Sequence, residues 1–177
     1  MSILFGGIRQ LGMVVRDCEE AMQQWGKMGV GPWFTMRFTV DDYIYRGEPS
    51  PAPDITLCFA HSGPLQLELI QQHNDVPSGW KEFLASGKQG AQHVAAWCAD
   101  HATFDAKRDE LIAGGFVLVH AGGSRAADAR FAYFESSEPG GLQFELSEAL
   151  IHSGEEMRRT WEEAAECWDG KVLISNR

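Results

Sequence analysis

Two glutamates occupy nearly the same sequence context, and each lies where a carboxylate is costly to bury. Residues 64–71 read PLQLELIQ and residues 141–148 read GLQFELSE, so Glu68 and Glu145 both follow a leucine, a glutamine and an apolar residue. Alternating apolar residues are typical of a strand with one buried face. A carboxylate within such a strand is unfavourable unless it is paired or bound to a cation. Two carboxylates at equivalent positions therefore predict one shared partner.

A second pair of similar segments precedes these glutamates. IRQLGMVVRDCEEAMQQWGKMGVG begins at residue 8, and AQHVAAWCADHATFDAKRDELIAGGF begins at residue 91. Gln10 precedes Asp17 by the same number of residues as His93 precedes Asp100. Each segment reads as an apolar strand, an aspartate that caps a helix, and glycines that end the helix. Because both pairs of segments occur in the same order, the sequence predicts a duplicated module.

Each module is predicted to contain a strand, a helix and then three strands, which gives an α+β fold. Module one covers about residues 8–71 and module two about residues 91–148, so that residues 1–148 form one domain. The residues between 46 and 54 are predicted to form a polar, turn-rich loop. Helices are predicted at residues 18–28 and 103–113, with a short helical linker at 78–86. Strands are predicted at residues 8–15, 33–40, 55–61, 65–71, 92–99, 116–120, 131–135 and 142–147.

Residues 149–177 are predicted to form a C-terminal helical extension. Ser153 and Glu156 fit a capping box that opens a helix ending at about Cys167. Trp161 lies on its apolar face, and this face predicts packing on the helix's own module, a dimer contact or a lid over a pocket.

Alternation along the predicted strands places four polar side chains on one face of the sheet. Gln10, Glu68, His93 and Glu145 lie opposite the strongly apolar residues that can pack under helices. The other histidines of module one, His61 and His73, are predicted to lie at the surface.

This arrangement resembles the vicinal oxygen chelate superfamily, nearest to its glyoxalase I and methylmalonyl-CoA epimerase-like members. The resemblance covers roughly residues 8–148 and implies two paired βαβββ modules that form a cup-shaped mixed sheet around a metal ion. Carried over by position, Gln10 and His93 are the ligands from the first strand of each module, and Glu68 and Glu145 are those from the last. Epimerases of the family usually have histidine at the position of Gln10, which is a departure in this chain.

The resemblance implies one divalent metal ion and no other cofactor. One imidazole nitrogen with three oxygens suits Zn, Co, Ni or Mn. The expected activity is that of a metal-dependent isomerase, epimerase or lyase that removes a proton next to a carbonyl group, with Glu145 as the first candidate base and Glu68 as the second. Many aromatic residues favour a small hydrophobic or acyl-thioester substrate. Residues 121–129 are predicted to form a flexible loop at the pocket mouth.

Three other functions remain open from the sequence. A metal-free protein that binds or sequesters small molecules would keep the fold and the aromatic pocket without needing the acidic pair. An extradiol dioxygenase would use two histidines and one carboxylate on iron, which Gln10 disfavours. A structural or interaction role would use the C-terminal helix and its tryptophans.

The overall composition limits the classes of partner. The chain of 177 residues has 15 basic and 25 acidic residues and a net charge of −10, which disfavours nucleic acids and anionic membrane surfaces. No apolar run is long enough to span a bilayer, and the N-terminus does not resemble a signal peptide. The four cysteines form no CxxC pair, which favours a reducing cytoplasm. A homodimer is also expected.

Overall fold

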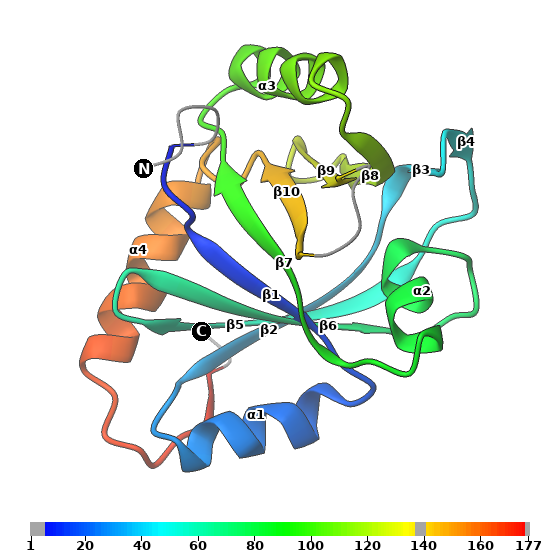
Figure 1. The fold of residues 1–177 in the computed structure, drawn as a ribbon. Helices are drawn as coiled ribbons and strands as arrows, with labels where there is room; N and C mark the ends of the chain where they lie inside the picture. Colours follow the sequence, from blue (N-terminus) through cyan, green and yellow to red (C-terminus); the bar gives the residue numbers. More distant parts are fainter. Residues whose placement is uncertain (1–5, 137–140, 176–177) are drawn as a thin grey trace.

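A computed structural model describes residues 6–136 and 141–175 of the chain. These residues form one mixed sheet that curls into a cup, with helices around it (Figure 1). The elements up to the middle of the chain are β1 (Gln10–Val14), α1 (Cys18–Lys27), β2 (Trp33–Thr39), β3 (Asp41–Tyr45), β4 (Glu48–Pro49), β5 (Asp54–Ser62), β6 (Leu65–Gln72) and α2 (Gly79–Ala85). Those that follow are β7 (Gly90–Trp97), α3 (His101–Ala113), β8 (Val117–Ser124), β9 (Ala129–Glu135), β10 (Gln143–Ser147), α4 (Gly154–Glu166) and β11 (Ile174–Ser175).

The duplicated pattern is visible in the order of the strands. Strands run β2-β5-β6-β1 in the first half and β7-β10-β9-β8 in the second, and the antiparallel pair β1–β7 joins the two halves within one chain. Within each half the first strand pairs in parallel with the last, as β1 with β6 and β7 with β10. The predicted α+β fold of two βαβββ modules with a C-terminal helix is therefore confirmed.

The helices begin where the sequence places their caps. The side chains of Asp17, Ser78 and Asp100 each accept a hydrogen bond from the backbone three residues later and so satisfy a free N–H of the first turn. On the outer side of the sheet, α1 packs over module one and α3 over module two, as Figure 1 shows below and above the sheet. Inside the cup, an apolar core that includes Trp80 of α2 fills one end.

One connection differs from the expected pattern. The segment after β2 forms β3, which leaves module one and pairs with β8 of module two. The short strand β4 then pairs with β3, although residues 46–54 were expected to form only a loop. The β2–β3 connection therefore links the two edges of the eight-strand core of the sheet.

The C-terminal extension contains α4 and β11. The helix begins at Gly154, but Ser153 makes no side-chain capping hydrogen bond, so the predicted capping box is absent. β11 was not expected, and it pairs in parallel with β2. The apolar face of α4 packs inside the cup, where the ring of Trp161 stacks on Phe34 and Phe59 at centroid distances of 5.2 and 5.1 Å. None of the helices in the described part of the chain has the length and apolar character that crossing a membrane requires.

Candidate metal centre

Three of the four predicted site residues converge at the junction of the two modules. Nε2 of His93 lies 3.2 Å from Oε2 of Glu68 and 3.2 Å from Oε2 of Glu145. The side chains come from β6, β7 and β10, and their ligand atoms all lie within 4.8 Å of one another. His93 is 0% exposed, Glu68 5% and Glu145 6%. A buried cluster of one imidazole and two carboxylates could hold a divalent cation.

Gly12 makes room for this cluster. It lies opposite His93 on β7 and opposite Glu68 on β6. A Cβ atom at this position would lie 1.8 Å from Cε1 and 1.9 Å from Nε2 of His93. The imidazole ring therefore lies directly against the backbone of β1, which only glycine allows.

Gln92 and Gln143 orient the imidazole of His93 from its Nδ1 side, away from the two glutamates. Nδ1 of His93 lies 2.8 Å from Oε1 of Gln92, so the ring N–H at Nδ1 donates to this amide. The amide of Gln92 in turn donates from Nε2 to Oε1 of Gln143. Such support fixes the tautomer and leaves Nε2 directed at the two glutamates, as metal-binding histidines require.

Gln10 lies beside the cluster and was predicted to be a fourth ligand. It is 3% exposed, and its Nε2 donates to Oε1 of Gln66 at 2.8 Å. The other atom of the amide, Oε1, is buried and has no hydrogen-bond partner among the described residues. Oε2 of Glu68 and Oε2 of Glu145 are also buried, and among the described residues they accept no hydrogen bond unless Nε2 of His93, 3.2 Å away, carries a proton. Buried oxygens without partners are unfavourable, and a cation would satisfy them. The donor set thus fits a divalent metal ion.

Burial and the neighbouring charges together shift the pKa values of Glu68 and His93. Burial raises the pKa of Glu68, and the nearby charge of Glu145 adds to this shift. Burial by itself would lower the pKa of His93, but hydrogen bonds to Glu145 and Glu68 raise it to about 9. A proton on Nε2 of His93 and a metal ion would therefore compete for the same position between the imidazole and the two carboxylates.

Tyr133 closes the cluster on the module-two side. Its hydroxyl lies 3.4 Å from Nε2 of His93, and the two rings meet edge to face at a centroid distance of 4.7 Å. Burial raises the pKa of Tyr133 well above its usual value, so the phenol stays neutral. In the sequence Tyr133 is one aromatic residue among many, whereas the structure brings it to the cluster.

A cavity of about 390 Å³ opens onto the cluster. Gln10, Glu68 and Glu145 lie in its wall, together with aromatic side chains such as Phe59, Phe131 and Trp161. Gly123, Ser124, Ala127 and Ala129 also line it, so the segment predicted as a pocket-mouth loop does border the cavity. Most of this segment belongs to β8 and β9, however, and only residues 125–128 form a turn.

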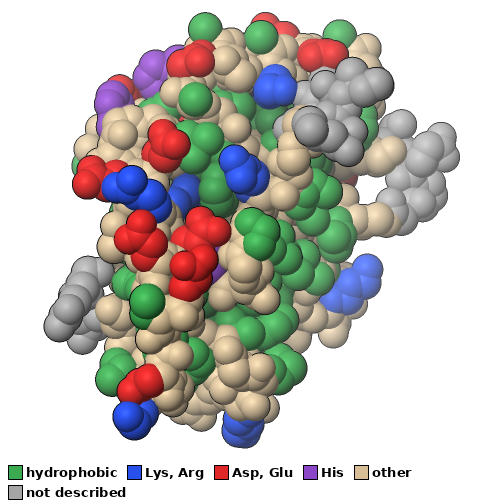
Figure 2. All heavy atoms as spheres, turned by 90° about the vertical axis from the view of Figure 1, so that its left-hand side faces the viewer, with side chains coloured by type: hydrophobic (Ala, Val, Ile, Leu, Met, Phe, Trp, Pro, Cys, Tyr) green, Lys and Arg blue, Asp and Glu red, His purple; other side chains and the backbone are tan. Residues whose placement is uncertain are grey.

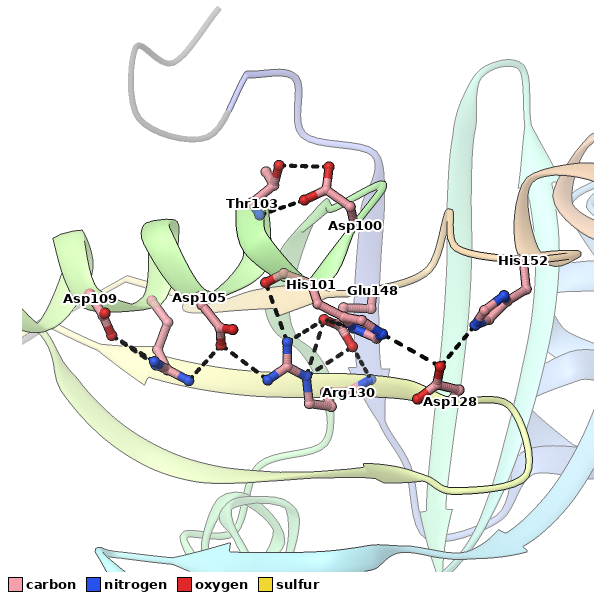
Figure 3. A network of polar contacts seen from close by, with 10 residues as sticks. Asp100, His101, Thr103, Asp105, Asp109, Asp128, Arg130, Glu148 and His152 are labelled. Carbon is pink, nitrogen blue, oxygen red and sulfur yellow. Dashed lines mark hydrogen bonds and ion pairs between the residues drawn. The ribbon is translucent and has the colours of Figure 1, made fainter.

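Glu148 and Arg130 fix the module-two side of the cavity through an ion-pair network (Figure 3). Arg130 donates from Nη2 to Oε1 of Glu148 at 2.6 Å and from Nη1 to Oδ1 of Asp105 at 3.0 Å. Nδ1 of His101 lies 2.8 Å from Oε1 of Glu148. Burial would raise the pKa of Glu148, but the hydrogen bonds from Arg130 and His101 lower it. The charges of Glu148 and Arg130 are therefore satisfied within the network.

Two surface predictions had different outcomes. His73 is exposed as expected, but His61 is 6% exposed and buried, so the prediction for His61 was wrong. His61 shares the inner face of β5 with Phe59, and α4 packs over this face through Trp161. Burial lowers the pKa of His61 to about 4, and the nearby charge of Arg158 adds to the effect.

Comparisons with known proteins agree with this arrangement. The family profile described as "Glyoxalase/Bleomycin resistance protein/Dioxygenase superfamily" matches residues 9–134, a segment that contains Gln10, Glu68 and His93 but ends before Glu145. Comparison with curated protein sequences gives no match.

Solved structures share the fold at low sequence identity. Methylmalonyl-CoA epimerase from Mycobacterium tuberculosis is 19% identical with a TM-score of 0.52, and the match covers 83% of this chain and 91% of that one. A Streptomyces coelicolor methylmalonyl-CoA epimerase variant in complex with 2-nitronate-propionyl-CoA is 16% identical with a TM-score of 0.53, covering 81% and 94%. A hypothetical protein from Bacillus halodurans is 14% identical with a TM-score of 0.52, covering 80% and 92%. With the profile match over most of its length, the chain belongs to the glyoxalase/bleomycin resistance protein/dioxygenase superfamily, which is the vicinal oxygen chelate superfamily.

Proposed function

We propose that the protein is a metal-dependent isomerase, epimerase or lyase that removes a proton from the carbon next to a substrate carbonyl group. The observation that carries this proposal is the buried cluster of Glu68, His93 and Glu145, whose two glutamates line a cavity with aromatic walls. Glu68, His93 and Glu145 would hold the cation, with Gln10 contributing Oε1 as a fourth ligand. Zn, Co, Ni or Mn fit this donor set.

The proposed chemistry divides between the cation and the glutamates. A divalent cation in this cluster supplies Lewis-acid stabilisation of negative charge on the substrate carbonyl oxygen. Glu145 accepts the proton as the substrate's C–H bond next to the carbonyl group breaks. The electron pair of that bond forms the enolate, whose negative charge lies on the carbonyl oxygen. Return of a proton by Glu68 to the opposite face of the same carbon gives epimerisation, and return to a neighbouring carbon gives isomerisation.

Two measurements test the proposal. Metal analysis of protein purified without chelators should give one equivalent of a divalent ion, and His93→Ala should lose it. Solvent-deuterium exchange should then occur in 2-substituted acyl thioesters or α-hydroxyketones. Glu145→Gln and Glu68→Gln should each abolish exchange, whereas Glu163→Gln on the exposed side of α4 should retain it. Stoichiometric metal without exchange across both substrate classes would refute the reaction.

A second function, metal-free binding of a small hydrophobic molecule, is favoured by one observation. The Nε2 atom of His93 is equally close to both carboxylates, so a protonated imidazole could balance their charge without a cation. Protein of this kind would contain no metal after purification and would bind apolar ligands equally well before and after chelator treatment. The homodimer and the cytoplasmic location expected from the sequence remain predictions, as does a domain boundary at residue 148.

A further inference from the structure

The helix α4 forms one wall of the cavity. It lies beyond the residues that the family profile matches, yet Met157, Arg158 and Trp161 border the same cavity as Glu68 and Glu145. Trp161 anchors the helix on the inner face of module one. Figure 2 views the molecule from the side of α4, where charged side chains are interspersed with hydrophobic ones. The outer side of the helix is polar and includes the exposed Arg159, so only its inner side serves the cavity.

Arg158 is held in a fixed orientation at this wall. Its Nε donates to the carbonyl oxygen of Ala149 at 2.9 Å, and its Nη1 donates to Oε1 of Gln66 at 3.1 Å. The guanidinium carbon lies 4.3 Å from the centre of the Trp97 ring, which supports the charged group from one side. Nη2 has no hydrogen-bond partner among the described residues. One amino group of a rigid guanidinium is therefore available to a ligand.

The charge of Arg158 is also unbalanced. Of the arginines that line the cavity, Arg37 pairs with Asp54 at 2.6 Å and Arg130 pairs with Glu148 at 2.6 Å. Within the described residues, Arg158 has no carboxylate oxygen within 4.0 Å. Burial lowers the pKa of Arg158 to about 10, although the charges of Glu68 and Glu145 oppose this shift. Arg158 is half-buried, and a cation partly removed from water without a partner is unfavourable, so the site favours an anion.

A metal ion in the adjacent cluster would strengthen the preference of Arg158 for an anion. Glu68 and Glu145 are the carboxylates whose negative charges act on Arg158. A dication held by these two carboxylates neutralises them, and the positive charge of Arg158 is then left for the substrate to balance. Since Nε and Nη1 already have acceptors, the remaining amino group suits a single carboxylate better than a doubly charged phosphate.

We propose that Arg158 is a substrate-binding residue that holds a carboxylate group of the substrate in the cavity, so that the substrate is a carbonyl compound with a carboxylate at its other end. This inference rests on the proposed function, because the carbonyl end occupies the metal cluster. The helix outside the matched family segment would thus determine substrate specificity.

The test uses two hydroxamates, which bind metals through two neighbouring oxygens. Succinic acid monohydroxamate carries a carboxylate at its far end, and butyrohydroxamic acid is its uncharged counterpart. Binding of both to the zinc-loaded full-length protein is measured by calorimetry. The wild type should bind the anionic probe about tenfold more tightly or better, which is the contribution of one charge-assisted hydrogen bond. Arg158→Met should bind both probes equally, Arg158→Lys should keep part of the preference, and Arg159→Met should keep all of it.

The outcomes separate the inference from the function on which it rests. Equal affinity of the zinc-loaded wild type for both probes overturns the role of Arg158 and leaves the metal site intact. A preference that persists in Arg158→Met also overturns it. Failure of the wild type to bind zinc or either probe overturns the proposed function and the inference together. If Arg158→Met does not fold, the preference of the wild type and its reduction in Arg158→Lys decide the question.

Discussion

Replacing Gly12 by alanine should push His93 out of the candidate metal centre. The added Cβ would lie 1.8 Å from Cε1, 1.9 Å from Nε2 and 2.4 Å from Nδ1 of the imidazole. Ordinary contacts between such atoms are about 3.5 Å, so the ring or the strand must move by roughly 1.7 Å. The ring cannot move freely, because it is fully buried, packs on Tyr133 and is hydrogen-bonded to Gln92.

The displacement has two measurable consequences. Metal–ligand distances tolerate changes of only about 0.2 Å, so a shift of this size removes His93 from the site and lowers metal affinity by at least about 100-fold. Overpacking should also destabilise the metal-free protein by about 1–3 kcal/mol. A chelator-competition titration measures the first effect, and urea denaturation in excess chelator measures the second. Gly7→Ala is the matched control, since no atom lies within 4 Å of a Cβ at Gly7.

A double-mutant cycle isolates the clash from other effects of alanine in a strand. In the His93→Ala background the obstructing ring is absent, so Gly12→Ala should cost little or nothing there. The coupling free energy between Gly12→Ala and His93→Ala should then be about 1–3 kcal/mol. The same destabilisation in both backgrounds, or unchanged metal affinity in Gly12→Ala, would refute the close approach of the ring to β1.

Three other changes test the surroundings of the site. Gln92→Leu removes the acceptor for Nδ1 of His93 and should lower metal affinity by about 10- to 100-fold in the chelator-competition titration. Trp161→Ala should destabilise the fold by about 3 kcal/mol in urea denaturation, because the indole stacks on two phenylalanines of the sheet, while metal content stays at the wild-type level. Hydrogen bonds from Arg130 lower the pKa of Glu148 in the fold against the effect of burial, so its stabilisation is present above about pH 4.3 and is lost as the pH falls through the folded value. The stability difference between wild type and Glu148→Gln should therefore shrink on acidification in thermal unfolding experiments, and a constant difference would contradict the ion-pair network.

The position of the cluster could be predicted from the sequence because two local signals agreed. The alternation of apolar residues assigned Glu68 and Glu145 to one face of their strands, and the repeat placed His93 at an equivalent position in the other module. The parallel pairing of β10 with β7 then brings the strands of Glu145 and His93 side by side. Neither signal depends on which distant strands pair. The alternation follows from the pleat of each strand, and the repeat is read from the sequence itself.

The elements that sequence patterns missed are held by contacts distant along the chain. β3 pairs with β8 across the cup, and β11 pairs with β2 from the far end of the chain. Asp42 within β3 has a positive φ, and the register shifts beside it, so no regular alternation marks this strand. The burial of His61 likewise depends on the position of α4, which a strand pattern in module one does not encode.

The repeat also explains why the amide oxygen of Gln10, rather than its nitrogen, is left without a hydrogen bond among the described residues. In each half, the glutamine two residues before the site glutamate accepts a hydrogen bond from a glutamine of the first strand. Gln66 accepts from Gln10 itself, and Gln143 accepts from the neighbour of His93. With its Nε2 engaged in this way, Gln10 has only its carbonyl oxygen free, and this atom is buried without a partner in the described part of the chain. The two contacts are comparable: Gln66 engages Nε2 of Gln10 and leaves Oε1 free, and Gln92 engages Nδ1 of His93 and leaves Nε2 free to act as a ligand atom. As the proposed fourth ligand, a glutamine held in this way would bind a cation more weakly than histidine does, but its oxygen would already be oriented.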